Sequence, residues 1–155
     1  MCDRRPCRML CRSQPVPDVR SFGIGRFIVP KTSIEQASHV QHLGPVTDRS
    51  EDLGGYTVNF VSFAADADLD GPLQALPGGA CQCPHWGYVI AGRMRFVFGD
   101  HEEIYEAGDA FYQPPGHRPY VDAGTELLQF SPTEKLEETE RALAEWMSRQ
   151  QGAPS

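Results

Sequence analysis

The chain has 155 residues, a net charge of −7 and an apolar content of 40%, which is enough for one domain with a hydrophobic core. Its 15 Gly and 13 Pro exceed what a helical bundle tolerates, and no apolar run approaches the roughly 20 residues that cross a bilayer. The composition therefore favours a soluble protein built from short strands and turns, without a membrane partner.

Charge is unevenly distributed along the chain. Residues 1–20 hold five Arg against Asp3 and Asp18, so this start carries +3 and the remainder carries −10. Nucleic-acid binding needs a basic patch to neutralise phosphates. The acidic body therefore argues against a nucleic-acid partner.

Residues 1–20 show neither helical nor strand periodicity and lack the apolar core of a secretory signal, so we expect a disordered tail. Cys2, Cys7 and Cys11 lie in this tail with no His nearby, which leaves a zinc or redox site there as the weaker alternative. A total of five Cys, an odd number, without an export signal favours a reducing cytoplasm over a disulfide framework.

Residues 22–63 are predicted to form two strands with a short helical segment between them. A short apolar run over 22–29 predicts a first strand, and residues 33–43 predict one or two helical turns that carry His39 and His42 as solvated side chains. The alternating, β-branched and aromatic segment Tyr56–Phe63 predicts a further strand.

Residues 64–79 predict a long loop. The loop contains Asp66-x-Asp68-x-Asp70-Gly71, which matches the opening of a calcium-binding loop. The match then fails, because Pro77 replaces the bidentate Glu and a strand precedes the loop where a helix is required. We therefore interpret this loop as an acidic, solvated connection.

Short alternating segments separated by turn residues fill most of the remaining chain. They predict strands at 93–98, 101–105, 111–113, 117–121 and 126–130. Six or more short strands at regular spacing point to an all-β antiparallel sandwich or barrel.

A terminal helix is predicted over residues 133–151, with Ser131 as N-cap, Pro132 at the first position and Glu134 completing a capping box. Its apolar residues fall mostly on one side, namely Leu136, Ala142, Leu143, Trp146 and Met147. The expected organisation is a tail over 1–20, a β-barrel over 21–132 and a helix over 133–151.

A set of metal-capable side chains lies at the centre of the sequence. Cys81, Cys83 and His85 alternate, and on an extended strand alternate side chains point to the same face. His117 follows the turn at 114–116 and can join them, and Pro84 can supply the bend that all three need to reach one ion. Two thiolates and two imidazoles predict a transition metal, zinc first, with iron or copper as alternatives and magnesium or calcium disfavoured.

The coordination number separates two roles for such an ion. If all four residues bind, the site is closed and structural. If three bind, an open position remains for water or substrate, as in catalytic sites. The alternative is that these Cys and His are ordinary core residues, since Cys is among the most buried residue types.

Aromatic residues near the predicted ligands could form the wall of a small-molecule pocket. They are Trp86, Tyr88, Phe96, Phe98, Tyr112 and Tyr120.

Two motifs resemble those of the cupin superfamily. One is His85-x-x-Tyr88-Val89-Ile90-x-Gly92, and the other is Gly108-(x5)-Pro114-x-Gly116. The resemblance covers Tyr56–Pro132 and is to a small single-domain bacterial cupin of the cupin 2 type. It implies an RmlC-like jelly-roll β-barrel.

The ligand positions depart from the cupin pattern. By alignment of the motifs, His85 stands where the family has Glu, and Cys81 and Gly79 stand where it has two His. The last His of the family falls at Pro119, two residues after His117. This chain would therefore bind its metal with an atypical Cys/His set.

The resemblance also implies a function. Many cupins are metal-dependent enzymes that act on small molecules, such as dioxygenases, isomerases and cyclases. A non-catalytic module that binds or senses a ligand, and a metal-free cupin with a structural core, remain alternatives. Cupins are often dimers, so we expect a homodimer.

Overall fold

The computed structural model describes residues 30–151 of the chain. The expected tail over 1–20 and the expected strand over 22–29 lie outside these residues. Among the described residues, no helix has the length and apolar character that crossing a bilayer requires.

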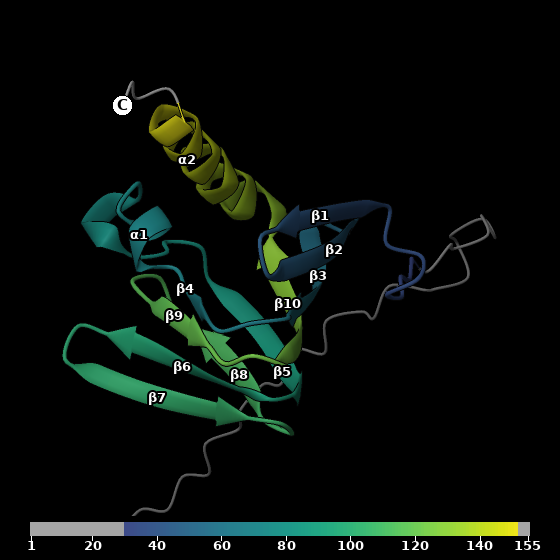
Figure 1. Ribbon diagram of the computed structural model, residues 1–155. Helices are drawn as coiled ribbons and strands as arrows, with labels where there is room; N and C mark the ends of the chain where they lie inside the picture. Colours follow the sequence, from purple (N-terminus) through teal and green to yellow (C-terminus); the bar gives the residue numbers. More distant parts are fainter. Residues whose placement is uncertain (1–29, 152–155) are drawn as a thin grey trace, which may run out of the picture.

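Two antiparallel sheets form the body of the protein (Figure 1). The six-stranded sheet has the strand order β1 (His39–Leu43), β2 (Val46–Leu53), β3 (Tyr56–Phe63), β10 (Glu126–Pro132), β5 (His85–Ala91) and β8 (Ala110–Gln113). The four-stranded sheet has the order β4 (Ala67–Asp68), β9 (Arg118–Val121), β6 (Arg93–Phe98) and β7 (His101–Glu106). Three helical segments complete the fold, namely α1 (Asp70–Leu73), the 3-10 turn η2 (Pro77–Gly79) and α2 (Thr133–Gln151).

The predicted all-β architecture with a terminal helix is confirmed. Neighbouring strands in one sheet are often distant in sequence, as β10 lies between β3 and β5. The polypeptide therefore folds as a jelly roll, in which the two sheets face each other across a shared core.

The core between the sheets follows from the alternation of side chains along each strand. Val89 is fully buried on β5, while its neighbour Ile90 is 50% exposed on the opposite face. One buried cluster joins both sheets and consists of Phe63, Val89, Met94, Phe96, Phe111, Val121 and Leu127. This apolar cluster fills most of the barrel.

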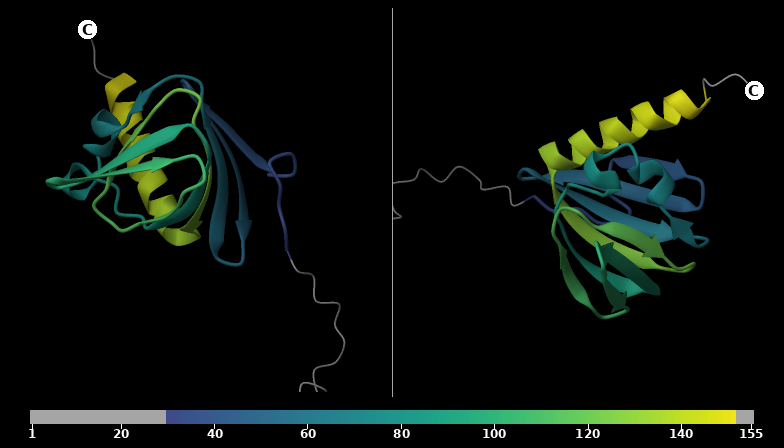
Figure 2. Two further views of the ribbon diagram at one scale, coloured as in Figure 1. Left: turned by 90° about the horizontal axis from the view of Figure 1, so that it is seen from below. Right: turned by 90° about the vertical axis from the view of Figure 1, so that its left-hand side faces the viewer.

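A second buried cluster closes one end of the barrel. Figure 2 shows α2 lying across this end, with the short helix α1 beside it. Leu73 of α1 and its neighbour Leu76 pack here with Cys81 and Cys83. Three residues of the apolar side of α2 pack against the cluster, namely Leu136, Ala142 and Leu143.

The predicted helical turns over 33–43 are wrong for most of their length. Residues 39–43 form β1, and the unpredicted β2 pairs with it through the register His39↔Ser50 to Leu43↔Val46. The turn between them places Gly44 at φ 61, a conformation that favours glycine. Pairing between the strands overrides the weak helical preference of this polar segment.

The terminal helix spans the predicted residues 133–151, but the predicted cap at its start is wrong. Ser131 and Pro132 belong to β10, where Pro132 faces Tyr56 of β3, and α2 begins at Thr133. Ser131 therefore does not act as the N-cap, and its hydroxyl is free for another contact.

The predicted loop over 64–79 contains short regular segments, β4, α1 and η2. Its aspartates serve structural contacts: Asp68 accepts a hydrogen bond from the Asp70 backbone N–H at 2.8 Å, and Asp66 accepts one from Ala123 at 2.8 Å. The Tyr120 hydroxyl donates to Asp70. These contacts agree with the rejection of a calcium loop.

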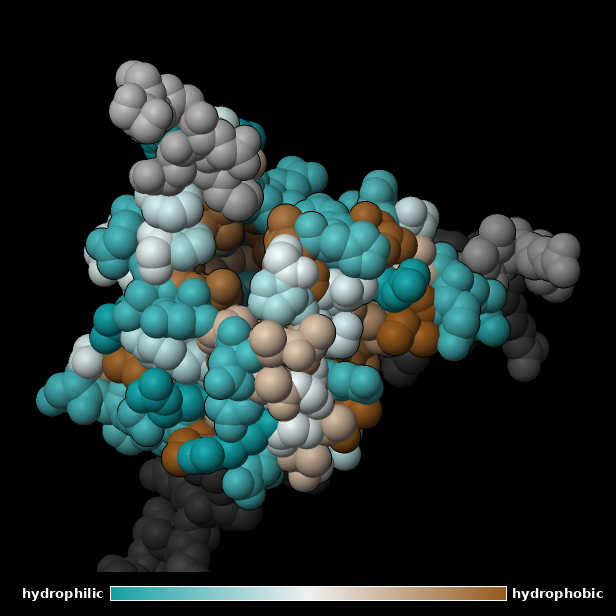
Figure 3. Space-filling view, in the orientation of Figure 1, coloured by the Kyte–Doolittle hydropathy of each residue, from teal (hydrophilic) through white to brown (hydrophobic). Residues whose placement is uncertain are grey.

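The hydropathy of the surface differs between the β6–β7 hairpin and the region near α2. In Figure 3 hydrophilic surface covers most of the β6–β7 hairpin, whereas hydrophobic surface reaches the outside near α2. A groove of about 410 Å³ lies between α2 and the β1–β2 hairpin and is lined by Gln41, Leu43, Asp48, Glu137, Glu140, Arg141, Leu143 and Ala144. None of the predicted site residues lines this groove.

Candidate metal centre

The backbone brings two distant segments together at the end of the barrel that α2 covers. Cys81 forms an isolated antiparallel bridge with His117. The Cys81 N–H donates to the His117 carbonyl at 2.9 Å, and the Gly116 N–H donates to the Cys81 carbonyl at 2.7 Å. Gly116 has φ 96, which allows the turn that returns the chain to β9.

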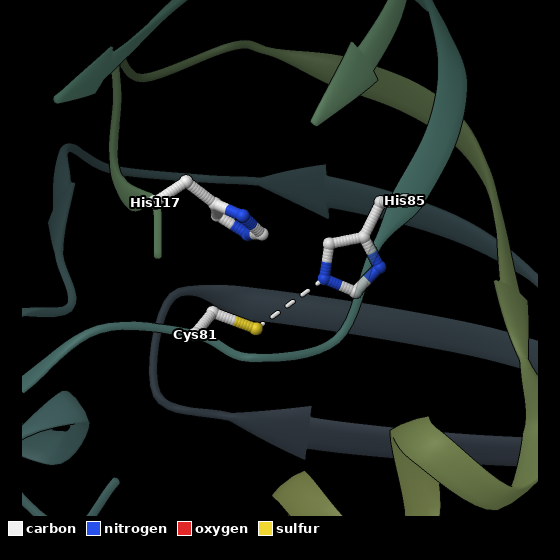
Figure 4. A group of neighbouring side chains, drawn as sticks. All are labelled: Cys81, His85 and His117. Atoms are coloured by element: carbon white, nitrogen blue, oxygen red, sulfur yellow. Dashed lines mark hydrogen bonds between the residues drawn. The ribbon is translucent and has the colours of Figure 1, made fainter. Parts of the chain in front are cut away.

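Three side chains point toward one another from these segments (Figure 4). Cys81 Sγ lies 3.5 Å from His85 Nε2, and the ring centroids of His85 and His117 are 5.1 Å apart. One ligand atom from each residue lies within 4.8 Å of the other two. Within residues 30–151 this is the one group of His, Cys, Asp or Glu whose ligand atoms come so close.

The three side chains are also buried. Cys81 and His85 are each 6% exposed, and His117 is 1% exposed. His117 packs against Phe96 and Phe98 of β6, with ring centroids 5.6 and 6.2 Å away. The site therefore lies between the apolar barrel core and the cluster beneath α2.

Each imidazole is held by a hydrogen bond on one ring nitrogen. His117 Nδ1 donates to the Pro114 carbonyl at 2.8 Å, which leaves Nε2 with its lone pair. His85 Nδ1 lies 2.8 Å from the Ser131 hydroxyl, and its Nε2 faces Cys81. Metal-bound histidines are commonly oriented in this way by a partner on the second nitrogen.

The distance between Cys81 Sγ and His85 Nε2 suits a small metal ion. Zinc–sulfur bonds near 2.3 Å and zinc–nitrogen bonds near 2.0–2.1 Å place two ligand atoms of a tetrahedral ion about 3.5 Å apart. The Sγ–Nε2 distance of Cys81 and His85 is 3.5 Å. This pair therefore has the ligand separation of a tetrahedral zinc ion, and the three ligand atoms lie within 4.8 Å of one another.

Burial sets the protonation of these groups. Burial, and then repulsion by His117, lowers the pKa of His85 to about 3, and burial lowers the pKa of His117. Burial also raises the pKa of the Cys81 thiol. Both imidazoles are therefore neutral at pH 7 and can ligate a metal, whereas the thiol must release a proton to do so.

The fourth predicted ligand, Cys83, does not belong to this group. Its side chain is 1% exposed and its thiol lies 3.5 Å from the Pro84 carbonyl. Burial, and then the neighbouring Cys81, raises the pKa of Cys83 to about 12. The regular strand begins at His85, so the alternation that would align Cys83 with Cys81 and His85 does not apply.

The structure separates the six residues of the predicted aromatic wall. Phe96 and Phe98 lie beside His117. Trp86, Tyr88 and Tyr112 are 41%, 45% and 50% exposed on the outer face of the six-stranded sheet.

These outer residues do not line the space around His85, because Trp86 and Tyr88 alternate with the inward-facing His85 and Val89 on one strand. The hydroxyl of the sixth residue, Tyr120, donates a hydrogen bond to Asp70. The Arg95 guanidinium carbon lies 4.2 Å from the centroid of the Tyr120 ring.

Gly87 lies on β5 two residues after His85, and neighbouring atoms fill the space above it. A Cβ at this position would lie 2.3 Å from Phe111 Cζ and 2.6 Å from the Leu128 carbonyl oxygen. Gly87 therefore permits close packing of the Phe111 ring.

Sequence reasoning missed two polar residues next to the predicted ligands. Ser131 holds His85, and Gln113 is paired directly with His85 across β5 and β8. Both side chains point inward by the alternation of their strands. Ser131 is on the same face of β10 as the buried Leu127, and Gln113 is on the same face of β8 as the buried Phe111. This parity was the available signal, and the helix-cap interpretation of Ser131 obscured it.

No protein-family model matches the sequence. No curated protein matches it either.

Solved structures of similar shape were found. A protein of unknown function from Rhizobium leguminosarum has 18% identity and a TM-score of 0.49, covering 66% of this chain and 94% of that one. An RmlC-like cupin from Shewanella frigidimarina has 17% identity and a TM-score of 0.47, covering 65% of this chain and 88% of that one. A mutant of the oxalate decarboxylase of Bacillus subtilis has 13% identity and a TM-score of 0.47, covering 65% of this chain and 28% of that one.

The fold itself is clear from the strand order of the two facing antiparallel sheets, with β10 between β3 and β5 and β9 between β4 and β6. By this arrangement the chain has a double-sheet jelly-roll fold.

Proposed function

We propose that the protein is a metal-binding cupin that binds or transforms a small organic molecule at a transition metal held by Cys81, His85 and His117. The observation that carries this proposal is the convergence of three buried ligand atoms within 4.8 Å of one another. Buried polar side chains are normally hydrogen-bonded or bound to a metal. Here Cys81 and His117 meet although they are more than thirty residues apart in the chain.

The donor set favours zinc, with iron or copper as alternatives. One thiolate and two imidazoles suit soft or borderline metals, and the cluster offers none of the carboxylates that magnesium and calcium prefer. Three protein donors leave one position of a tetrahedral ion for a ligand. When bound, such a metal would polarise an oxygen or nitrogen group of that ligand.

A metal-free cysteine nucleophile is the competing chemistry at this site. His85 contacts Cys81 Sγ through Nε2 at 3.5 Å and the Ser131 hydroxyl through Nδ1 at 2.8 Å. The three residues thus form a chain of contacts like that of a catalytic triad. The protonation states oppose this function, because burial raises the pKa of the thiol and lowers the pKa of His85 to about 3. A neutral thiol beside a neutral imidazole is a poor nucleophile.

Elemental analysis of the purified protein tests the proposal. We expect about one transition-metal ion per chain, and we expect His85→Ala and His117→Ala to lose it while retaining the far-ultraviolet circular dichroism of the barrel. His101→Ala is a matched control, because His101 is exposed and bonded to Glu103 on the β6–β7 hairpin. Protein without metal would leave the metal-free cupin with a structural core as the better description. Variants that keep the metal would show that it binds away from His85 and His117.

A second assay separates an enzyme from a binding or sensing module. Oxygen consumption or turnover of candidate small molecules that disappears with the metal supports a dioxygenase, isomerase or cyclase. Tight binding of a small molecule without turnover supports a sensor. The free thiols of Cys81 and Cys83 support a reducing compartment such as the cytoplasm for either function.

We also propose that the protein is a homodimer, and we assign the interface to the outer face of the six-stranded sheet. Large apolar side chains there form an outer patch of Tyr56, Trp86, Tyr88, Ile90, Tyr112 and Phe130, each 40–50% exposed. The Trp86 ring lies 4.9 Å from Tyr112 and 6.3 Å from Tyr56, so the aromatic residues form one continuous surface.

The size of the outer patch supports a second copy as its partner. Aromatic side chains offer roughly 150–250 Å² each, so exposures of this size leave on the order of 500 Å² of apolar surface per chain. Two such faces would bury about 1,000 Å², which reaches the lower range of specific interfaces. In a dimer with a two-fold axis, the outer patch of one subunit would pack against the outer patch of the other.

A further inference from the structure

Gln113 is a buried polar side chain whose amide nitrogen has no partner among the described residues. It is the last residue of β8 and is 1% exposed. Its Nε2 atom has no hydrogen-bond partner among the described residues. Buried polar groups are nearly always paired with protein, water or a ligand, so this donor calls for an acceptor that the chain does not supply.

The position of Gln113 places this donor beside the metal-ligating residues. Gln113 and His85 are directly opposite each other in the register of β8 and β5. Such cross-strand pairs have Cβ atoms roughly 4.5–5.5 Å apart and project to the same face. Phe111, two residues earlier, lies in the barrel core, whereas the intervening Tyr112 is 50% exposed. The Gln113 amide therefore enters the same interior as His85.

The other buried atoms without partners differ from this one. Asn59 Oδ1 and Asp70 Oδ1 are acceptors, and each belongs to a side chain that makes other hydrogen bonds, to Asp48 and Tyr120 respectively. Gln113 Nε2 is the one unpaired buried donor of the described side chains. An amide donor next to a cluster of metal ligands suits an oxygen atom that lies at the open coordination position.

We propose that Gln113 is a positioning residue that donates a hydrogen bond from Nε2 to an oxygen-bearing ligand of the Cys81, His85 and His117 site, such as a small carboxylate. This inference rests on the proposed function, because it requires a metal at that site. A neutral amide is suited to this task, since it offers N–H donors without the charge that would repel a carboxylate. Gln113 thus selects small ligands with an acceptor oxygen over ligands without one.

Formate binding to the cobalt-loaded protein tests this inference without any assay of activity. Cobalt(II) replaces the native metal, its visible absorption reports the coordination sphere, and formate is the probe. We expect Gln113→Met, which keeps the size of the side chain but removes the donor, to bind cobalt with unchanged stoichiometry and formate about tenfold more weakly. We expect Gln113→Glu to weaken formate binding further through repulsion. The matched control is Tyr112→Phe, because Tyr112 is on the same strand and faces outward; its formate affinity should equal that of the wild type.

Three results would overturn the inference. The first is equal formate affinity in the wild type and in Gln113→Met, or in Gln113→Glu should the Met variant not fold. The second is a wild-type cobalt protein whose absorption does not respond to formate. The third is a wild type that gives no cobalt absorption, and this result alone would remove the proposed metal site as well.

Discussion

Nδ1 of His85 lies 2.8 Å from the hydroxyl oxygen of Ser131, which is fully buried on the neighbouring strand β10. This contact fixes the ring so that Nε2 faces Cys81 Sγ. A residue that orients a metal ligand commonly contributes a factor of about 10–100 to metal affinity.

We therefore expect Ser131→Ala to bind one metal per chain with about tenfold weaker affinity, because the His85 ring loses its support. Competition with a chromogenic chelator measures the affinity. Ser62→Ala is the control, since Ser62 lies on β3 opposite Glu126 and away from the site. Equal affinities in Ser131→Ala and the wild type would show that Ser131 does not orient the ligand.

The two buried cysteines should behave differently. Cys81→Ala removes a donor of the three-residue group and should lower the bound metal to well below one per chain. Cys83→Ala should retain the metal, because the Cys83 thiol lies outside the group and contacts the Pro84 carbonyl. Elemental analysis of both variants checks this, and loss of metal from Cys83→Ala would restore the four-ligand site that the sequence predicts.

Acid should destabilise the metal-free protein through His85. Its folded pKa is about 3, below the ordinary value of 6.5, so the unfolded chain takes up a proton more readily. The stability contributed by the neutral ring is complete above about pH 6.5 and falls as the pH drops toward 3, by at most about 1.4 kcal/mol per pH unit. The lowered pKa of His117 acts in the same direction.

Urea denaturation of chelator-treated protein between pH 7 and pH 4 measures this effect. We expect His85→Gln to have a shallower dependence of the free energy of unfolding on pH than the wild type. Comparison of slopes removes the contribution of other groups that titrate in this range. Parallel curves would mean that His85 is not held neutral by burial.

Gly87→Ala should destabilise the fold by about 1–3 kcal/mol, because a Cβ there would lie 2.3 Å from the Phe111 ring and 2.6 Å from the Leu128 carbonyl oxygen. Gly71→Ala is the control, since a Cβ at Gly71 meets nothing within 4 Å. The free energy of unfolding in urea distinguishes the two variants. A fully stable Gly87→Ala would contradict the close packing of Phe111 on β5.

Charge in the outer patch should separate the two subunits of the proposed dimer. Trp86→Arg places a cation at the centre of the apolar surface, where burial of a charge is unfavourable. We expect light scattering to give the mass of a dimer for the wild type and of a monomer for this variant, with metal content unchanged. Ile104→Arg is the control, because Ile104 is similarly exposed but lies on β7 of the other sheet. A monomeric wild type would refute the dimer.

The sequence alone determined the fold class and pointed to the residues of the candidate site. Segments of alternating polar and apolar residues, bounded by turn residues, predict most of the later strands, because side-chain direction along a strand is a local property. For example, β6 is observed at the predicted residues 93–98. The same local signals singled out Cys81, Cys83, His85 and His117 as metal-capable residues, and three of these four lie in one group in the structure.

Only the tertiary structure decided which side chains share a space. The polar strand β1 forms because β2 pairs with it, and Ser131 reaches His85 because β10 lies beside β5. Cys83 lies outside the three-residue group because the regular strand starts at His85. Each of these outcomes depends on which strands become neighbours. That choice is made by burial of the whole core and is not encoded in any single segment.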